Sequence, residues 1–250
     1  MLDNQRLLDA LQRNEMLVGL STRVLRQLLA AGVVRTFALD EALIHQGDPA
    51  RWFAIVIEGR AKLVQLALDA RQVLVRYIGP PQEFGIIAVL PGFDYPLTVQ
   101  AVEPCTAIFW DGETFGQFMR QHAQIGFNAL RVMVIRNQET QHRYQELLTE
   151  RVEQRLARAL LRLAEMAGEQ IETGVLLAIP FTREDLAELT GTTLFSVSRT
   201  LSIWDQAGLV ETGRERIVVR SLDRLREFAA VPEPLPSCPV CGYLRLRKDH

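Results

Sequence analysis

A stretch without proline, from Phe115 to Leu148, sets the first limit on how this chain can fold. Apolar and amphipathic side chains recur along it at alternating intervals of four and three residues, which is typical of one face of a long helix. This face consists of Leu130, Val134, Asn137, Gln141, Tyr144 and Leu148. A helix of about thirty residues is longer than one small domain can cover. We therefore expect a dimerisation helix over residues 115–148; the alternative is a helix that only packs on its own neighbouring domain.

The residues before this helix predict two kinds of structure. Residues 1–30 carry leucines at helical spacing and should form N-terminal helices. Residues 31–114 contain short apolar runs separated by turn signals such as Gly79-Pro80-Pro81 and Pro91-Gly92. The runs are Phe53 to Ile57, Ala61 to Leu68, Val73 to Ile78 and Leu97 to Val102. Short strands at this spacing favour an antiparallel β-roll, or jelly roll.

The residues after the long helix, 149–229, contain a helix-turn-helix pattern. Thr182 and Asp185 have the spacing of a capping box, which starts a helix. Gly191 ends that helix with a tight turn, and a second helix should run to about Ala207. The small side chain of Ala187 in the first helix and Val197 in the second allow the two helices to pack closely. A hairpin over Leu209 to Val219 would follow as a wing.

The second helix of this pair has an unusual outward surface. Only Val197 and Leu201 are needed inward, which leaves small hydroxyls and Arg199 outside. A guanidinium can bond to guanine O6 and N7 together, so this surface suits the major groove of DNA. The candidate DNA contacts are Thr182, Arg183, Thr192, Thr193, Phe195, Ser196, Ser198, Arg199, Ser202 and Arg214. An ordinary helical hairpin without DNA contacts is the alternative.

A row of arginines precedes the helix-turn-helix. Arg151, Arg155, Arg158 and Arg162 lie four, three and four residues apart, so they share one face of a helix. Such a row is usually solvated. Beside a DNA-reading unit it is also a candidate contact for DNA phosphates.

Composition limits the cellular context. The net charge of -2 argues against unspecific adhesion to nucleic acid but leaves room for a local basic patch. No run of about 18 apolar residues occurs, so we expect no transmembrane helix and no membrane partner. The N-terminus lacks the pattern of a signal peptide. Three cysteines do not form a disulfide framework. These features together predict a reducing, cytoplasmic location.

The proline-rich tail, residues 230–250, contains a possible metal or redox motif. Cys238 and Cys241 have the spacing with which two thiolates bind one ion. Zinc requires four ligands. His250 could be a third ligand, and the same pair from a second copy could complete an all-thiolate site. A redox dithiol and an inert tail are the alternatives. His45 and Cys105 are single residues, and we expect them to be ordinary loop or core residues.

Several short motifs match a known family in the same order. In the roll these are Gln46-Gly47-Asp48-Pro49, Ile57-Glu58-Gly59-Arg60 and Glu83-Phe84-Gly85. In the helix-turn-helix they run from Thr182-Arg183-Glu184-Asp185-Leu186-Ala187 to Val197-Ser198-Arg199-Thr200-Leu201. Over about Phe37 to Phe228 the chain resembles the CRP/FNR superfamily of bacterial transcription regulators.

The resemblance implies an α+β fold with a β-roll, a long dimerisation helix and a winged helix-turn-helix. It also implies a cytoplasmic homodimer, a transcription activator rather than an enzyme, which contacts RNA polymerase. Its partner would be double-stranded DNA with a two-fold-symmetric operator. In that family the residue matching Arg199 reads a base. Phe195 stands where the family usually has a glutamate, and it cannot accept a hydrogen bond from cytosine. An apolar contact with a thymine methyl is the expected replacement.

The candidate effector pocket departs from the cyclic-AMP binders of the family. Those proteins place a glutamate after Phe-Gly and an Arg-Ser pair on the phosphate, whereas this chain has Ile86 and the pair Tyr95 and Pro96. A buried phosphate without a cation or hydroxyl donor would be strongly destabilised. We therefore expect no cyclic AMP. No cysteine precedes Cys105, so the iron-sulfur centre of the oxygen-sensing branch is not expected either.

Two other functions compete with DNA-binding regulation by an unidentified effector. One is a ligand-sensing signalling module that acts through protein contacts and has a decayed reader. The other is a thiol-redox protein built on Cys238 and Cys241. The intact helix around Arg199 and the wing argue against the first. The absence of a βαβ pattern around the two cysteines argues against the second.

Overall fold

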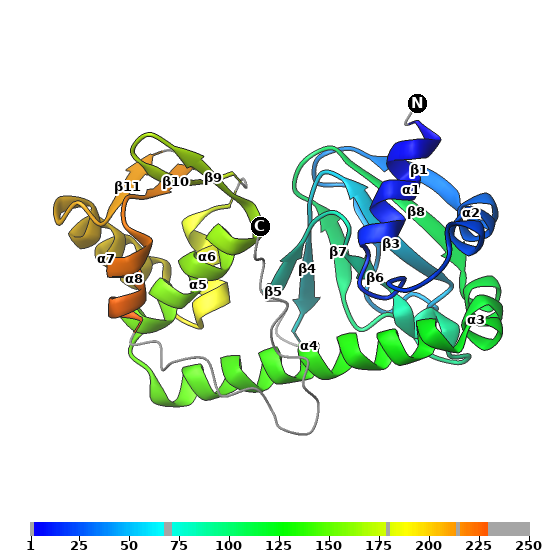
Figure 1. Cartoon of the computed structure of the whole chain (residues 1–250). Helices are drawn as coiled ribbons and strands as arrows, with labels where there is room; N and C mark the ends of the chain where they lie inside the picture. The colour runs from blue at the N-terminus through cyan, green and yellow to red at the C-terminus, as the bar shows by residue number, and fades with distance from the viewer. Residues whose placement is uncertain (1–2, 68–71, 179–180, 214–215, 230–250) are drawn as a thin grey trace, which may run out of the picture.

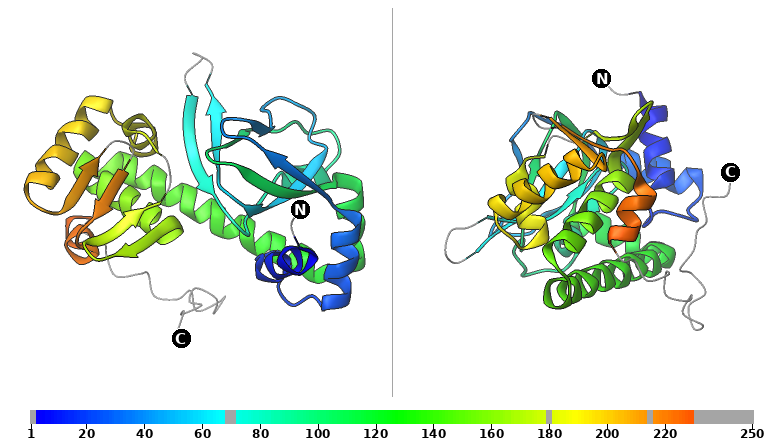
Figure 2. Two further views of the ribbon diagram at one scale, coloured as in Figure 1. Left: turned by 90° about the horizontal axis from the view of Figure 1, so that it is seen from above. Right: turned by 90° about the vertical axis from the view of Figure 1, so that its left-hand side faces the viewer.

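The chain folds into two domains joined by one long helix. The structure, a computed structural model, describes residues 3–67, 72–178, 181–213 and 216–229. Helix α4 (Ala123–Thr149) runs beneath both domains, with the roll at one end and the C-terminal domain at the other (Figures 1 and 2). This arrangement confirms the predicted α+β fold.

Two helices cover one face of the roll at its N-terminal end. Helix α1 (Asn4–Arg13) begins at Asp3 and helix α2 (Thr22–Ala31) begins at Ser21, and each cap side chain accepts a hydrogen bond from a backbone N–H of the first turn. Their buried leucines share a core with Phe53, Ile108 and Trp110 of the roll. The indole of Trp110 donates to the Leu28 carbonyl at 2.7 Å, which joins α2 to the sheet.

The roll consists of two antiparallel four-stranded sheets. One has the order β1 (Val33–Phe37), β8 (Cys105–Asp111), β3 (Trp52–Glu58) and β6 (Glu83–Phe84). The other has the order β2 (Ala42–Ile44), β7 (Thr98–Ala101), β4 (Ala61–Leu66) and β5 (Gln72–Ile78). Their facing side chains, among them Val56, Phe84 and Phe109, form the inner core. The predicted β-roll is therefore present.

The helical region after the roll differs from the single helix expected over residues 115–148. Helix α3 (Gly112–Gln121) begins earlier, capped by Asp111, and α4 is a separate helix. His122 adopts φ -127° and ψ 83°, which interrupts the helical hydrogen-bond pattern between them. No proline or glycine marks this break in the sequence, so its pattern did not reveal it.

The C-terminal domain combines helices with a small sheet. Its helices are α5 (Val152–Ala167), α6 (Arg183–Thr190), α7 (Leu194–Gln206) and α8 (Leu222–Phe228). The sheet has the order β11 (Val210–Gly213), β12 (Arg216–Val219), β10 (Gly174–Leu177) and β9 (Gly168–Ile171), in antiparallel pairs. The β11–β12 hairpin is the expected wing; the β9–β10 hairpin was not predicted.

The two domains also touch each other directly. Helix α6 lies against β5, and one continuous apolar cluster contains Leu74 and Tyr77 of the roll together with Leu186 of α6. The Glu188 carboxylate accepts from the Leu74 N–H at 2.8 Å. Arg60 donates to the Ala178 carbonyl at 2.9 Å. The position of the helix-turn-helix is thus tied to the β4–β5 side of the roll.

None of the helices in the described residues is both long enough and apolar enough to cross a membrane.

Candidate nucleic-acid interface

The helix-turn-helix is built by local signals at both ends of α6. Thr182 Oγ1 accepts from the Asp185 N–H at 3.0 Å, and the Asp185 carboxylate accepts from the Thr182 N–H at 2.7 Å. Gly191 then ends the helix with φ +59°, a left-handed conformation that a side chain disfavours. The Thr192 N–H donates back to the Ala187 carbonyl at 2.9 Å, which closes the turn toward α7.

Helix α7 has one buried face and one open face. Thr193 caps it by accepting from the Ser196 N–H at 3.2 Å. Val197 and Leu201 are fully buried, as expected, and Thr200 and Trp204 also point into the core. Phe195 is 75% exposed. Arg199 is exposed and has no side-chain partner among the described residues, so its guanidinium is available to a ligand outside the chain.

The other candidate DNA contacts lie around this open face. Thr182, Arg183 and Thr193 are exposed at the helix starts, and Thr192, Ser196 and Ser198 are half-buried. Ser202 is exposed, but its hydroxyl donates to the Ser198 carbonyl at 2.9 Å. Arg214 lies outside the described residues.

The wing adds one basic residue that the sequence interpretation missed. Arg216, at the start of β12, lines a cavity of about 320 Å³ together with Arg183 at the start of α6. Two guanidinium groups at one opening suit an anionic oxygen such as that of a DNA phosphate. The sequence did carry a signal for Arg216, because this basic residue lies three positions after Gly213 in the predicted hairpin.

Asp205 of α7, which the sequence interpretation also missed, connects this helix to the wing. The Asp205 carboxylate accepts from the Thr212 hydroxyl at 2.6 Å and from the Thr212 N–H at 3.1 Å. These two hydrogen bonds lower the pKa of Asp205, because they stabilise the charged form. These two hydrogen bonds join the end of α7 to the start of the wing.

The arginine row of α5 does not lie free for DNA phosphates, so that interpretation is wrong for three of its members. Arg155 donates to the carbonyls of Glu150 and Thr190, each at 2.8 Å. Arg158 pairs with Glu150 and Arg162 with Glu146, each at 2.9 Å. These side chains hold the junction of α4 and α5 instead. Only Arg151, at the cap of α5, is exposed.

The apolar face of α4 is largely uncovered within one chain. Leu130 is 62% exposed, Val134 49%, Tyr144 65% and Leu148 67%. Asn137 and Gln141 are exposed on the same face, and Phe127 extends it toward the roll. Large apolar side chains in a row on one helix are typical of a helix-to-helix interface.

Of the three candidate effector residues, only Tyr95 is buried in the roll. The Tyr95 hydroxyl accepts from the Trp52 N–H at 2.7 Å and donates to the Trp52 carbonyl at 2.8 Å. Burial raises the pKa of this phenol. Ile86 is half-buried at the start of a short 3-10 helix (Ile86–Val89), and Pro96 is exposed. Tyr95 therefore bonds to the backbone of the roll, at the position where the cyclic-AMP binders are expected to have the arginine of their Arg-Ser pair.

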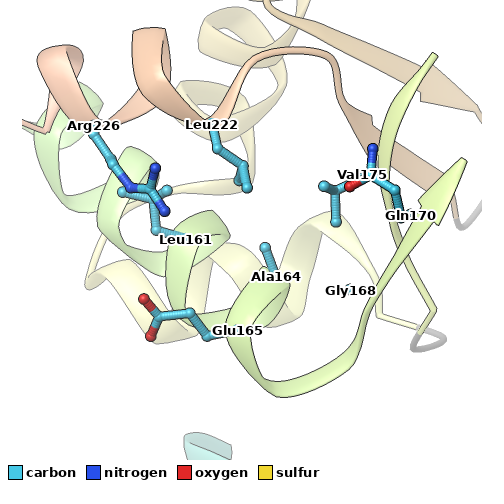
Figure 3. Close-up of a pocket in the computed structure, with 8 residues that line it drawn as sticks. All are labelled: Leu161, Ala164, Glu165, Gly168, Gln170, Val175, Leu222 and Arg226. Carbon is cyan, nitrogen blue, oxygen red and sulfur yellow. The ribbon is translucent and has the colours of Figure 1, made fainter. Parts of the chain in front are cut away.

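A second cavity of the C-terminal domain and the metal-ligating residue types add no candidate DNA contact. A cavity of about 210 Å³ between α5, α8 and the β9–β10 hairpin is lined by aliphatic side chains together with Glu165, Gln170 and Arg226 (Figure 3). The described residues contain no cluster of three or more metal-ligating side chains. Cys238, Cys241 and His250 lie outside these residues, and Cys105 is buried and free.

Comparison with known proteins gives a consistent result for both domains. Residues 34–122 match the cyclic nucleotide-binding domain family, and residues 154–228 match the Crp-like helix-turn-helix domain family. A CRP-like cAMP-activated global transcriptional regulator of Mycobacterium tuberculosis is 23% identical over 77% of this chain and 86% of its own length. The transcriptional regulator LdrP of Thermus thermophilus is 26% identical over 78% of this chain and 96% of its own. The solved structure of FixK2 from Bradyrhizobium japonicum superposes with a TM-score of 0.70, at 20% identity over 80% of this chain and 98% of that one.

Proposed function

Because the chain belongs to the CRP/FNR superfamily of DNA-binding transcription regulators, we propose that it reads a specific operator through helix α7. As a member of this family it is a regulator and not an enzyme. The observation that carries the proposal is the open face of α7, where the side chains of Phe195 and Arg199 are exposed. Arg183 and Arg216 line one cavity between the start of α6 and the wing, and they suit the DNA backbone.

The protein acts as a homodimer in this proposal. Two copies of α4 would bury the exposed face from Leu130 to Leu148, and the resulting two-fold axis would relate two reading helices. The operator would then be two-fold symmetric, with half-sites about one helical turn apart. By analogy with the family, we further propose that the protein contacts RNA polymerase, activates transcription and is located in the cytoplasm.

The effector is a molecule other than cyclic AMP. The relative from Mycobacterium tuberculosis is described as cAMP-activated, but in this chain Ile86, Tyr95 and Pro96 supply no cation for a phosphate. Tyr95 is also committed to the Trp52 backbone by two hydrogen bonds. Binding of zinc, or reversible oxidation, at Cys238 and Cys241 is a second proposed input.

Replacement of Arg199 tests the DNA-reading role. Arg199→Ala should weaken operator binding by about 1–3 kcal/mol per half-site and relax selection at one base position. The measurement is selection of binding sites from random DNA, followed by titration of the selected site. Arg224→Ala, which removes an exposed arginine from α8 in the same domain, is the matched control. If wild type and Arg199→Ala select the same sequence with equal affinity, α7 is not the reading helix.

A further inference from the structure

Arg155 of α5 joins the ends of two other helices. Its Nη1 donates to the carbonyl of Glu150 at 2.8 Å, and Glu150 is the C-cap residue of α4. Its Nε donates to the carbonyl of Thr190, the last residue of α6, at 2.8 Å. Its Nη2 makes a longer hydrogen bond to the carbonyl of Gly191 at 3.5 Å. One side chain therefore contacts both the end of the long helix and the turn of the helix-turn-helix.

The chemistry of helix ends explains why an arginine suits this position. The last carbonyls of a helix have no partner inside the helix and carry a partial negative charge. A guanidinium group presents several N–H donors in a fixed plane, so it can bind carbonyls of two helices at once. A lysine ammonium group is a point charge without this planar arrangement. The half-buried Arg155 is thus matched to the junction by its shape as well as by its charge.

The last turn of α4 makes a second contact with the same turn. A Cβ placed on Gly191 would lie 2.5 Å from Leu147 Cδ2, so Leu147 packs directly against Gly191. The next residue, Leu148, is 67% exposed on the apolar face of α4. Adjacent residues of α4 therefore contact the helix-turn-helix and lie on the surface that a second copy would cover.

The angle between α4 and α5 is held by two neighbouring arginines. Arg158 pairs with both carboxylate oxygens of Glu150, at 3.0 Å and 2.9 Å. Arg162 pairs with Glu146 at 2.9 Å. A bidentate pair fixes the relative orientation of its two partners. Arg155 therefore extends from a helix that is itself held against α4.

The reading helix begins directly after the turn that Arg155 contacts. Only Thr192 and Thr193 separate Gly191 from Leu194, the first residue of α7. A change in the position of Gly191 would therefore be passed on to α7 with little slack. The position of α7 relative to the long helix thus depends on the contacts made at this turn.

The roll holds other parts of α6. The Glu188 carboxylate accepts from the Leu74 N–H at 2.8 Å, and Lys62 Nζ lies 3.7 Å from the Asp185 carboxylate. Neither contact involves α4. These contacts place α6 against β4 and β5, whereas Arg155 ties its end to the long helix.

We propose that Arg155 fixes the distance and angle between the two reading helices of the dimer, and with them the half-site spacing that the protein accepts. The inference rests on the proposed function, because it requires a homodimer joined through α4. One base pair more or fewer moves a half-site by about 3.4 Å along the DNA and rotates it by about 35°. Reading helices that are held rigidly bind one spacing well, whereas loosely held ones follow several. Arg155 is a positioning residue, and Arg199 keeps its role in reading bases.

Selection from operator libraries measures spacing and base preference separately. The libraries contain two copies of the selected half-site, with the spacer between them varied by one base pair at a time. Arg155→Gln should lower the preference for the best spacer over its neighbours by roughly fivefold or more, because hydrogen bonds from a charged group are lost. Base preference within each half-site should stay as in wild type, and Arg155→Lys should give an intermediate spacing preference. Arg224→Gln, at an exposed arginine of α8, is the control and should match wild type.

A second measurement needs no DNA. Spin labels on His142→Cys and Gln206→Cys, two exposed positions on α4 and α7, report the distance between these helices by double electron–electron resonance. The two tail cysteines are replaced by serine, and the buried Cys105 can stay. An excess of unlabelled protein restricts the signal to distances within one chain. We expect a broader distance distribution in Arg155→Gln than in the same chain with Arg155.

The outcomes separate the role of Arg155 from the proposed function. An unchanged spacing preference or an unchanged distance distribution in Arg155→Gln overturns this role and leaves operator reading intact. Loss of base preference together with spacing preference overturns it as well, because the helix-turn-helix itself would then have lost its structure. If Arg155→Gln does not fold, Arg155→Lys provides the same comparisons. A wild type that selects no sequence overturns the proposed function, and the distance measurement then decides whether Arg155 holds α7 against α4.

Discussion

Replacement of Gly191 by alanine tests whether the left-handed turn between α6 and α7 holds the DNA-reading unit in shape. Its φ of +59° costs a residue with a side chain about 1–2 kcal/mol. The added Cβ would also lie 2.5 Å from Leu147 Cδ2. Leu147 is 47% exposed, so its side chain can rotate away at little cost. Alanine lowers the entropy of the unfolded chain, which offsets about 0.4–1 kcal/mol. The expected net loss of stability is about 1 kcal/mol.

The matched control is Gly116→Ala in α3. Gly116 is inside a helix, and a Cβ there would make ordinary contacts of 3.5 Å with Arg120 and 4.0 Å with Val89. Alanine in such a position stabilises a helix by about 0.5–1 kcal/mol. The two glycine substitutions should therefore change stability in opposite directions.

Urea unfolding of protein labelled with 5-fluorotryptophan can measure both effects. Trp204 lies in the core of the C-terminal domain and Trp110 in the core of the roll, so their fluorine signals report on the two domains. Gly191→Ala should lower the midpoint at Trp204 by roughly 0.3–1 M, and Gly116→Ala should raise the midpoint at Trp110. A midpoint for Gly191→Ala at or above that of wild type would refute the argument from backbone conformation.

Three further predictions concern other parts of the molecule. Val134→Glu should place two like charges across the dimer axis, and sedimentation should then show monomers with lost operator binding; an unchanged dimer would place the interface elsewhere. Cyclic AMP and cyclic GMP should bind no better than an unrelated nucleotide, and micromolar affinity in calorimetry would contradict the assignment of Tyr95. Burial, and then the charge of Glu103, raises the pKa of Cys105 to about 12, so its protonated thiol should resist alkylation at pH 9 until urea is added. Because the folded pKa is the higher one, this thiol favours folding below its unfolded pKa of about 9, and the benefit is lost as pH rises toward 12. Rapid alkylation in the folded protein would show that the thiol is accessible.

Local signals explain what could be predicted from sequence. The capping pair Thr182 and Asp185 and the turn at Gly191 act within a few residues, and the structure contains both. The inward positions of Val197 and Leu201 follow from helical spacing, and both are fully buried. The strands of the roll were predicted for the same reason, because alternation and turn residues are visible along the chain.

Interactions between distant segments explain what was missed or misassigned. Arg162 was interpreted as a candidate phosphate contact, but its partner Glu146 lies sixteen positions earlier, on another helix. Arg76 of β5 lines one cavity together with Arg136 and Arg143 of α4, and no spacing rule connects these positions. The hydrogen bonds between Asp205 and Thr212 span a turn whose geometry the residue types alone did not specify. Pairings of this kind depend on the tertiary fold rather than on local patterns.

The open face of α7 has a consequence for how this regulator can change over generations. Phe195 and Arg199 make no side-chain hydrogen bonds with the described residues, and both are exposed. Substitutions at such positions usually alter folding stability by less than about 0.5 kcal/mol. The buried side of the same helix, at Val197 and Leu201, carries the packing that keeps it in place. If α7 reads the operator as proposed, mutations at Phe195 and Arg199 can change the target genes and leave the scaffold intact, so that regulatory networks can diverge while the fold is retained.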